Sequence, residues 1–248
     1  MAPSRPVVLI TGGSNGIGLV TCDHLASKGT FQILLGTRSP EKGEKAVSEI
    51  KSKYPGSTIS SLQIDITSDD SIAAAFKHVE STYGKLDALV NNAGICPTEF
   101  SRSILRETLE TNVTSHAAVT ETFAPLLSKS SSPRVLYVSS ELGSITLRSD
   151  PKSRARDEEY KAYRISKAAL NMLVACDAWE HSDYKVFGYC PGYVITDLAG
   201  MREEKIKQGF AQQPDGSARG IAAIVEGKRD AEAGKFLHGE EEGEVHPW

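Results

Sequence analysis

The chain has 248 residues, a formal net charge of −4 at pH 7 and a pI near 5.9. This length supports one full core as a single α/β domain, and the dispersed Lys and Arg residues argue against nucleic acid as a partner, because phosphate binding needs a concentrated basic face. No apolar run is long enough to span a bilayer and residues 1–6 lack the apolar stretch of a signal peptide, so we expect a cytoplasmic protein with no membrane partner.

The first predicted strand, residues 7–10, is a β-branched apolar run that leads directly into a glycine-rich turn. The turn reads Thr-Gly-Gly-Ser-Asn-Gly-Ile-Gly over residues 11–18, and a helical pattern follows over residues 19–27. Such a unit binds anions, because glycines let the backbone approach a pyrophosphate and the helix N-terminus offers unpaired N–H groups. The spacing differs from the common Gly-x-Gly-x-x-Gly fingerprint, and a tight strand-to-helix connection is the alternative interpretation.

Strand-like runs then recur between helical stretches, which is typical of repeated βαβ units. They lie near residues 7–10, 31–35, 59–64, 86–90, 134–139, 185–189 and 235–237. We therefore predict one Rossmann-type domain over residues 1–248, a doubly wound parallel sheet with helices on both faces. Ligands of such sheets bind beyond the carboxyl ends of the strands. Six polar or turn residues fall at those ends: Thr11, Arg38, Asp65, Asn91, Ser140 and Pro191.

A second motif, Tyr-x-x-x-Lys, joins Tyr163 and Lys167, with Ser140 upstream at the end of an apolar run. On a helix this spacing puts the phenol and the ammonium on one face, where the cation is expected to lower the phenol pKa and make Tyr163 a general acid or base. An amphipathic surface pair is the alternative. Tyr160 competes for the acid role with Arg164 four residues later, but a guanidinium substitutes poorly for an ammonium that touches both phenol and ribose.

Both motifs in this order, with Asn91-Asn92-Ala93-Gly94 and Pro191-Gly192, resemble the short-chain dehydrogenase/reductase family over essentially the whole chain. The resemblance implies catalytic roles for four residues, namely Ser140, Tyr163, Lys167 and Asn112, the last holding a water that connects Lys167 to solvent. It also implies contact with a dinucleotide coenzyme for Thr11, Gly12, Ser14, Asn15, Gly16, Ile17, Gly18, Thr37, Arg38, Asp65, Ile66, Asn91, Ala93, Gly94, Tyr163, Lys167, Pro191, Gly192, Val194 and Thr196. Lys167 is expected to hydrogen-bond the ribose hydroxyls.

Coenzyme choice depends on Thr37 and Arg38, which follow the second predicted strand. NAD-preferring relatives carry an acidic residue near Thr37, whereas Arg38 can meet a 2′-phosphate, so we predict NADP(H). Asn15 weakens this prediction, because many NADP-dependent relatives have a basic residue there.

Two segments extend beyond a bare sheet. Residues 144–159 resemble a shortened form of the insertion of monomeric carbonyl reductases and form either a solvated loop or a lid over the substrate. Residues 193–213 match the family's substrate loop, where Met201 and Phe210 line a pocket or pack against the body. The acidic tail is expected to be solvated, with Trp248 packed back against the domain.

The remaining reactive side chains indicate no metal site. The four cysteines lie far apart in the sequence and fit reduced thiols, and the histidines form no ligand-spaced cluster. His116 comes one helical turn after Asn112 and is either a neighbour of the proton path or an ordinary helix residue.

The leading hypothesis is an NADP(H)-dependent oxidoreductase that interconverts a ketone or aldehyde and an alcohol on a small to medium, fairly apolar substrate. Epimerisation, dehydration or enone reduction on the same scaffold is an alternative, as is a dinucleotide-binding sensor without catalysis. Helices near residues 103–127 and 159–180 are apolar on more than one face, which favours a homodimer or homotetramer, although the insertion resembles that of monomeric relatives.

Overall fold

A computed structural model describes residues 5–156, 159–239 and 245–248 of the chain. Within them, seven strands form one sheet in the order β3-β2-β1-β4-β5-β6-β7, and every neighbouring pair is parallel. The strands are β1 (Val7–Ile10), β2 (Gln32–Thr37), β3 (Thr58–Gln63), β4 (Ala88–Asn91), β5 (Arg134–Val138), β6 (Lys185–Cys190) and β7 (Phe236–His238). Each overlaps a predicted strand, so the predicted doubly wound sheet is confirmed.

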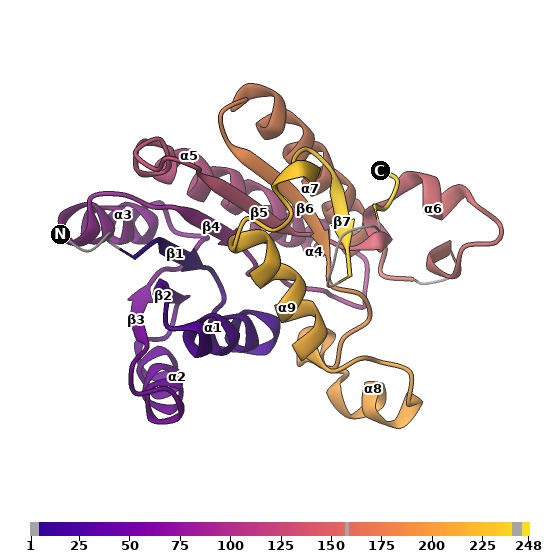
Figure 1. Cartoon of the computed structure of the whole chain (residues 1–248). Coiled ribbons are helices and arrows are strands. Elements are labelled where there is room, and N and C mark those ends of the chain that lie inside the picture. The colour runs from indigo at the N-terminus through magenta and orange to yellow at the C-terminus, as the bar shows by residue number, and fades with distance from the viewer. Residues whose placement is uncertain (1–4, 157–158, 240–244) are drawn as a thin grey trace.

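Helices cover both faces of the sheet (Figure 1). The longer ones are α1 (Gly16–Lys28), α2 (Pro40–Lys53), α3 (Asp69–Tyr83), α5 (Ser115–Leu127), α7 (Lys161–Glu180) and α9 (Pro214–Val225). The shorter ones are α4 (Arg102–Leu109), α6 (Ile145–Ser149), α8 (Arg202–Gln208), the π-helical turn η1 (Glu110–Thr114) and the 3-10 turns η2 (Glu141–Gly143), η3 (Arg154–Arg156), η4 (Leu198–Gly200) and η5 (Asp230–Glu232). One apolar cluster joins the sheet to α1, α2 and α9, and another joins it to α3, α5 and α7.

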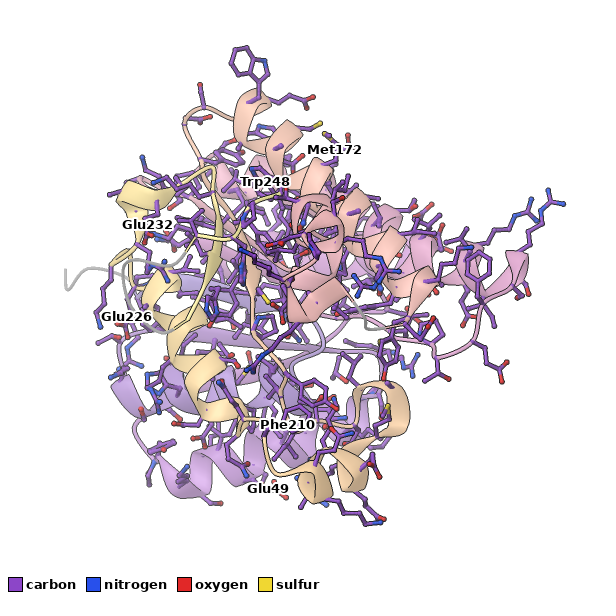
Figure 2. The ribbon with its side chains drawn as sticks, turned by 90° about the vertical axis from the view of Figure 1, so that its right-hand side faces the viewer. Glu49, Met172, Phe210, Glu226, Glu232 and Trp248 are labelled. Carbon is purple, nitrogen blue, oxygen red and sulfur yellow. The ribbon has the colours of Figure 1, made fainter. Side chains whose placement is uncertain are left out.

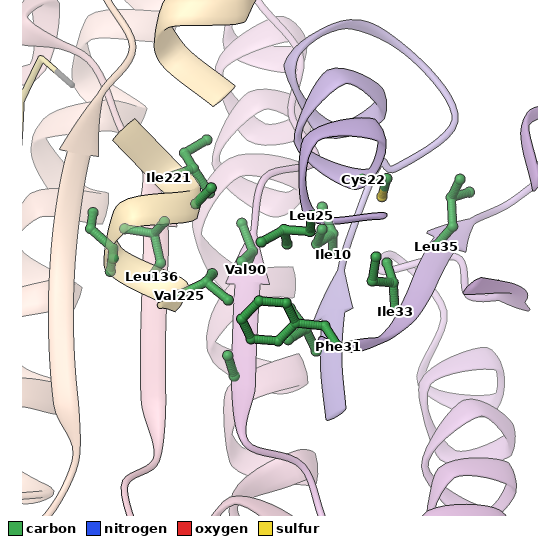
Figure 3. Close-up of a cluster of buried hydrophobic side chains, with 14 of the residues drawn as sticks. Ile10, Cys22, Leu25, Phe31, Ile33, Leu35, Val90, Leu136, Ile221 and Val225 are labelled. Atoms are coloured by element: carbon green, nitrogen blue, oxygen red, sulfur yellow. The ribbon is translucent and has the colours of Figure 1, made fainter. Parts of the chain in front are cut away.

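The core explains why the strands are continuous apolar runs. A parallel strand between two helical layers is buried on both faces, so alternation with polar residues is lost. Leu25 of α1 and Ile221 of α9 meet the β1 residue Ile10 and the β4 residue Val90 in one cluster (Figure 3). All four side chains are fully buried.

Short polar side chains set where the helices begin after the strands. Asn15, Ser39, Ser68 and Ser101 each accept a hydrogen bond from a backbone N–H in the first turn of α1, α2, α3 and α4, respectively. Such caps satisfy N–H groups that have no partner within the helix. These caps fix where α1, α2, α3 and α4 begin beyond the sheet. The starts of α1 and α2 lie beside the cleft described below.

The winding of the sheet reverses between β3 and β4. Both β2 and β4 pair with β1, so the chain crosses from the edge strand β3 back to the centre. Just beyond this point the backbone N–H of Thr11 donates to the Val90 carbonyl oxygen at 3.0 Å. A crevice between the carboxyl ends of the strands is expected at such a reversal.

The two segments outside the bare sheet contain short helices rather than open loops. Residues 144–156 form α6 and η3, which project from the body (Figure 1), and residues 193–213 contain η4 and α8. Trp248 stacks on Phe236 of β7 with ring centroids 5.4 Å apart, as the sequence predicts. No helix in the described ranges has the length and apolar character needed to cross a membrane.

Candidate active site

A cleft of about 780 Å³ opens at the carboxyl ends of the strands. Its walls come from the turns after β1, β2, β3, β4 and β6 and from α7. Fifteen of the predicted site residues line it, namely Gly12, Ser14, Asn15, Gly16, Ile17, Thr37, Arg38, Asp65, Ile66, Ala93, Gly94, Tyr163, Lys167, Pro191 and Thr196. The two motifs, about 150 residues apart in the sequence, therefore share one cavity.

The Thr11 side chain joins the start of the glycine-rich turn to the residues that follow β4. Its hydroxyl oxygen accepts hydrogen bonds from the backbone N–H groups of Asn92 at 3.0 Å and Ala93 at 3.2 Å. Gly12 has a left-handed φ of +65°, and a Cβ on Gly18 would lie 2.6 Å from the Gly12 carbonyl oxygen. The turn thus packs so closely on the end of β4 that side chains at these glycines would displace it.

Cations gather at the β2 end of the cleft. Arg38 lines the wall and is exposed, and Lys42 of α2 lines the wall beside it. Thr67 hydrogen-bonds the Asp65 carboxylate and holds its pKa below the usual range, and the nearby charge of Arg38 acts in the same direction. The neutral Thr37 hydroxyl contacts Ser14 Oγ at 3.0 Å. This end of the cleft therefore combines two cations with a neutral residue at the position where an acid would select NAD.

Tyr163 and Lys167 lie one turn apart on α7, buried to 8% and 4% exposure, and both line the cleft. Lys167 Nζ donates to the Val138 carbonyl oxygen at 2.7 Å and lies 5.5 Å from the centroid of the Tyr163 ring. Ser140, two residues after the end of β5, accepts from the Leu142 N–H at 3.2 Å and interacts with the phenol through its hydroxyl. The phenol, ammonium and hydroxyl predicted from the sequence are thus close together.

The predicted effect of Lys167 on the phenol is wrong. Burial raises the pKa of Tyr163 well above its usual value, the Cys96 and Cys190 thiols raise it further, and only the Ser140 hydroxyl lowers it. Burial also lowers the pKa of Lys167 to about 8, partly offset by the same two thiols. Desolvation therefore dominates the titration of the phenol.

The competing pair, Tyr160 and Arg164, is directed elsewhere. The Tyr160 hydroxyl donates to Met201 Sδ at 3.1 Å, while Arg164 donates to the carbonyl oxygens of Glu159 at 3.0 Å, of Leu142 at 3.2 Å and of Ala155. Arg164 therefore ties the segment with α6 and η3 to α7. Tyr160 itself has a left-handed φ of +55° at the start of α7.

Seven predicted residues do not line the cleft as described: Thr11, Gly18, Asn91, Asn112, Ser140, Gly192 and Val194. Asn112, in the π-helical turn η1, is fully buried. Its amide exchanges hydrogen bonds with the Ile95 backbone, both at 2.9 Å, and donates to Ser166 Oγ at 3.0 Å. Its side chain thus ties η1 to α7, and its role in holding a water stays a prediction.

Sequence reasoning missed several wall residues. They include Ser39, Lys42, Thr67, Cys96, Glu107 and Glu110. Lys42 carried the clearest signal, because a basic residue in the first turn of a helix that begins beside Arg38 faces the same strand end. The described residues contain no group of three or more His, Cys, Asp or Glu side chains arranged to hold a metal ion.

Comparison with known proteins fits this geometry. Residues 6–207 match the family model described as short chain dehydrogenase. The chain belongs to the short-chain dehydrogenase family. It is an oxidoreductase of that family and is 38% identical to the short-chain dehydrogenase anuI of Penicillium roqueforti, covering 96% of each chain. It is 35% identical to the short-chain dehydrogenase/reductase tropE of Talaromyces stipitatus, covering 98% of each.

A solved carbonyl reductase is similar over the full length. The NADPH-bound carbonyl reductase from chicken fatty liver superposes with a TM-score of 0.83 at 27% identity, covering 99% of this chain and 100% of that one. The short-chain dehydrogenase fold of this chain therefore includes its carboxyl-terminal part, beyond the residues that the family model matches.

Proposed function

We propose that the chain reduces a ketone or aldehyde to an alcohol, or catalyses the reverse reaction, with NADP(H) as coenzyme. The observation that carries the proposal is that Tyr163, Lys167, the glycine-rich turn and the Arg38–Lys42 pair line one cleft. The similarity to a carbonyl reductase that binds NADPH supports the same assignment.

The cleft fits a dinucleotide with a 2′-phosphate. Gly12 and Gly16 have left-handed φ angles of +65° and +54°, and α1 begins beside them with its N–H groups available to a pyrophosphate. Arg38 and Lys42 would pair with the 2′-phosphate. When bound, the coenzyme supplies the hydride.

The side chains on α7 and after β5 supply the proton. Because burial raises the pKa of Tyr163, the phenol stays protonated at neutral pH, which is the form that donates to a carbonyl oxygen. With a pKa of about 8, Lys167 is mostly charged at pH 7, and we expect its ammonium to hydrogen-bond the ribose hydroxyls of the coenzyme. Ser140 Oγ accepts from the Leu142 N–H, and its own proton can donate to the carbonyl oxygen of the substrate.

The test is NADPH oxidation measured against ketones, diketones, quinones and aldehydes, with Tyr163→Phe as the decisive variant. Phenylalanine keeps the ring and its packing but removes the proton donor, so turnover is expected to fall by about two orders of magnitude or more. Binding of NADPH, measured by calorimetry, should be retained.

Tyr160→Phe is the matched control and should keep most of the turnover, since its hydroxyl contacts Met201. Near wild-type turnover in Tyr163→Phe would overturn the assignment. Tight NADPH binding without turnover on any member of the panel would favour a dinucleotide-binding protein without this catalysis.

A further inference from the structure

Among the described strands, β7 lies at one end of the sheet and pairs with β6 along one side. The other side of such a strand is an edge, where backbone N–H and C=O groups can pair with another chain. Residues 245–248 lie along this edge. Val245 forms an antiparallel bridge with Leu237, and the His246 N–H donates to the Phe236 carbonyl oxygen at 2.8 Å. We call residues 245–248 the cap, because they pair with the edge of β7.

Aromatic rings and a backbone hydrogen bond hold the cap in place. Trp248 stacks on Phe236 at an interplanar angle of 13°, with ring centroids 5.4 Å apart. The His246 ring lies 5.4 Å from the Phe236 ring and 4.6 Å from the His238 ring. The Thr146 N–H of α6 donates to the Trp248 carbonyl oxygen at 3.2 Å, so the end of the cap lies between β7 and α6 (Figure 1).

The cap covers an apolar side chain at the edge of the sheet. Side chains alternate between the two faces of a strand. Leu237 packs in the cluster with α1, α2 and α9, so Phe236 points to the opposite face. Phe236 is fully buried, whereas Val245 and Trp248 are 45% and 39% exposed, so the cap itself lies at the surface. Removal of the cap would expose an apolar ring together with unpaired backbone groups, which is a surface suited to association.

The cap repeats the sequence pattern of β7. The Gly188 N–H of β6 donates to the Lys235 carbonyl oxygen, and alternate residues of a strand pair in opposite directions, so the backbone groups of residues 236 and 238 point to the edge. Two β7 strands paired antiparallel about a two-fold axis would therefore place Leu237 opposite Leu237 and Phe236 opposite His238.

The residues of the cap occupy the same positions. Val245 lies opposite Leu237, and His246 lies opposite Phe236. An aliphatic residue followed by a histidine thus stands in the cap where Leu237 and His238 of a second copy would stand. This match indicates that the partner that fits the edge is a second copy of the chain.

The outer side of the cap offers little for further pairing. Because the His246 N–H points to β7, the backbone groups of residue 247 point away from the sheet. Pro247 has no N–H to donate. Proline at such a position discourages the addition of another strand. The cap therefore closes the edge and does not extend it.

We infer that residues 245–248 are an intramolecular substitute for the β7 strand of a second copy and prevent self-association through this edge. When the cap is displaced, two copies pair β7 with β7 in antiparallel orientation, with Leu237 opposite Leu237. This inference concerns assembly and is independent of the proposed function. The readout of its test is mass and cross-linking, so a failure of either proposal leaves the other standing.

The test is the mass of cap variants, measured by light scattering at high micromolar concentration. The parent protein carries Met172→Lys and Trp179→Lys at two exposed positions of α7, so that association through this helix does not contribute. His246→Pro removes the N–H that donates to Phe236, and Trp248→Ser removes the stacked ring. The two changes together should double the mass of the parent.

Ile145→Ser is the matched control. It removes a large side chain that is 70% exposed on α6, next to the residue that contacts the cap, and leaves the contacts of the cap intact. The mass of the parent should be unchanged by it. A doubled mass in this control as well would show that surface changes near α6 act without the cap, and would overturn the inference.

A cross-link identifies the edge that pairs. Leu237→Cys places a thiol opposite the same thiol of the second copy, at a non-hydrogen-bonded position whose spacing suits a disulfide. Cys176, an exposed native thiol, is replaced by serine in these samples. With oxidised glutathione as oxidant, the cap variant should form a covalent pair, and the yield with an intact cap should be about tenfold lower because the edge is covered.

Three outcomes would contradict the inference. The first is the mass of the parent in the variant that carries both cap changes. The second is large particles without the Leu237→Cys cross-link, since exposed rings would then only aggregate. If circular dichroism shows that the double variant does not fold, the milder Trp248→Ser decides alone: it should shift the mass toward the doubled value, and the mass of the parent at the highest concentration would be the third.

Discussion

His116 is fully buried on α5 beside the candidate site, and neither of its ring nitrogens makes a hydrogen bond to the described part of the chain. Its ring meets Tyr137 edge-on, with centroids 6.4 Å apart. Burial lowers the pKa of His116 to about 3, the Lys167 ammonium adds to this, and the Ala93 backbone opposes it weakly. The imidazole is therefore neutral at pH 7.

His116 should make the fold sensitive to acid. Its folded-state pKa of about 3 lies below the unfolded value of 6.5, so the unfolded chain binds the proton more readily. Stability is therefore lost as the pH falls below about 6.5, at about 1.4 kcal/mol per pH unit from this group. The variant His116→Phe lacks this titration. In urea titrations, the free energy of unfolding of the variant minus that of the wild type should therefore increase from pH 7 to pH 4. A difference that stays constant with pH would contradict this prediction.

The cations after β2 should decide coenzyme preference. A charge-assisted contact contributes about 1.5–3 kcal/mol, or about one to two orders of magnitude in affinity. Arg38→Leu should therefore lower kcat/KM for NADPH by about that factor and leave NADH nearly unchanged, and Thr37→Asp combined with Arg38→Leu should reverse the preference. Lys45→Met, an exposed position on α2 outside the cleft, is the control. Equal use of both coenzymes by the wild type would show that Arg38 faces solvent and that the neutral Asn15 is the more informative residue.

The helix α7 carries three functions on three sides. Tyr163 and Lys167 face the cleft, while Leu170 and Val174 pack into the core. Ile165, Met172 and Trp179 follow at intervals of seven residues, two helical turns, and are 39%, 65% and 87% exposed. Met172 projects from α7 at the molecular surface (Figure 2). These three residues form an apolar stripe on a helix whose other sides are occupied.

The stripe is expected to mediate self-association, because large exposed apolar side chains in a row typically mark an interface. Light scattering at micromolar concentration should give a mass of at least two chains of 26.7 kDa. Combining Met172→Lys with Trp179→Lys should reduce it to one chain. Ile145→Lys, at a position 70% exposed on α6, is the control and should keep the wild-type mass. A wild type with the mass of one chain would rule out this interface.

The segment of α6 and η3 shows what sequence patterns miss at this scale. The sequence predicted a solvated loop or a lid over residues 144–159, of which 157 and 158 lie outside the described residues. Arg164 helps to hold the segment, because its guanidinium contacts the backbone carbonyls of Ala155 and Glu159. Any residue type supplies a carbonyl, so these acceptors leave no trace in the sequence. The substrate loop differs, because the stacking of Tyr193 on Phe210, with ring centroids 5.5 Å apart, depends on aromatic residue types that the sequence shows.

For the molecule as a whole, the sequence was most informative where burial is complete. Strands such as β1 and β5 are covered on both faces and appear as unbroken apolar runs, and the residues after them fall at one edge by topology alone. The wall residues Lys42 and Cys96 depend on how a helix or loop is rotated, which spacing does not determine. The rise of the Tyr163 pKa comes mainly from desolvation, and only the three-dimensional structure shows how deeply the phenol is buried.

The position of β1 between β2 and β4 has a consequence for synthesis on the ribosome. Val8 pairs with Ala88, so one edge of β1 stays open until β4 has emerged, and the Thr11 N–H lacks its Val90 acceptor until then. At roughly 5–20 residues per second, the wait from β2 to β4 lasts several seconds. The glycine-rich turn is thus among the first segments synthesised, but it reaches its final conformation only after β4 has been synthesised and has paired with β1. The crossover from β3 to β4 therefore sets an interval in which an open apolar edge can associate with other chains, a vulnerability that the finished sheet no longer has.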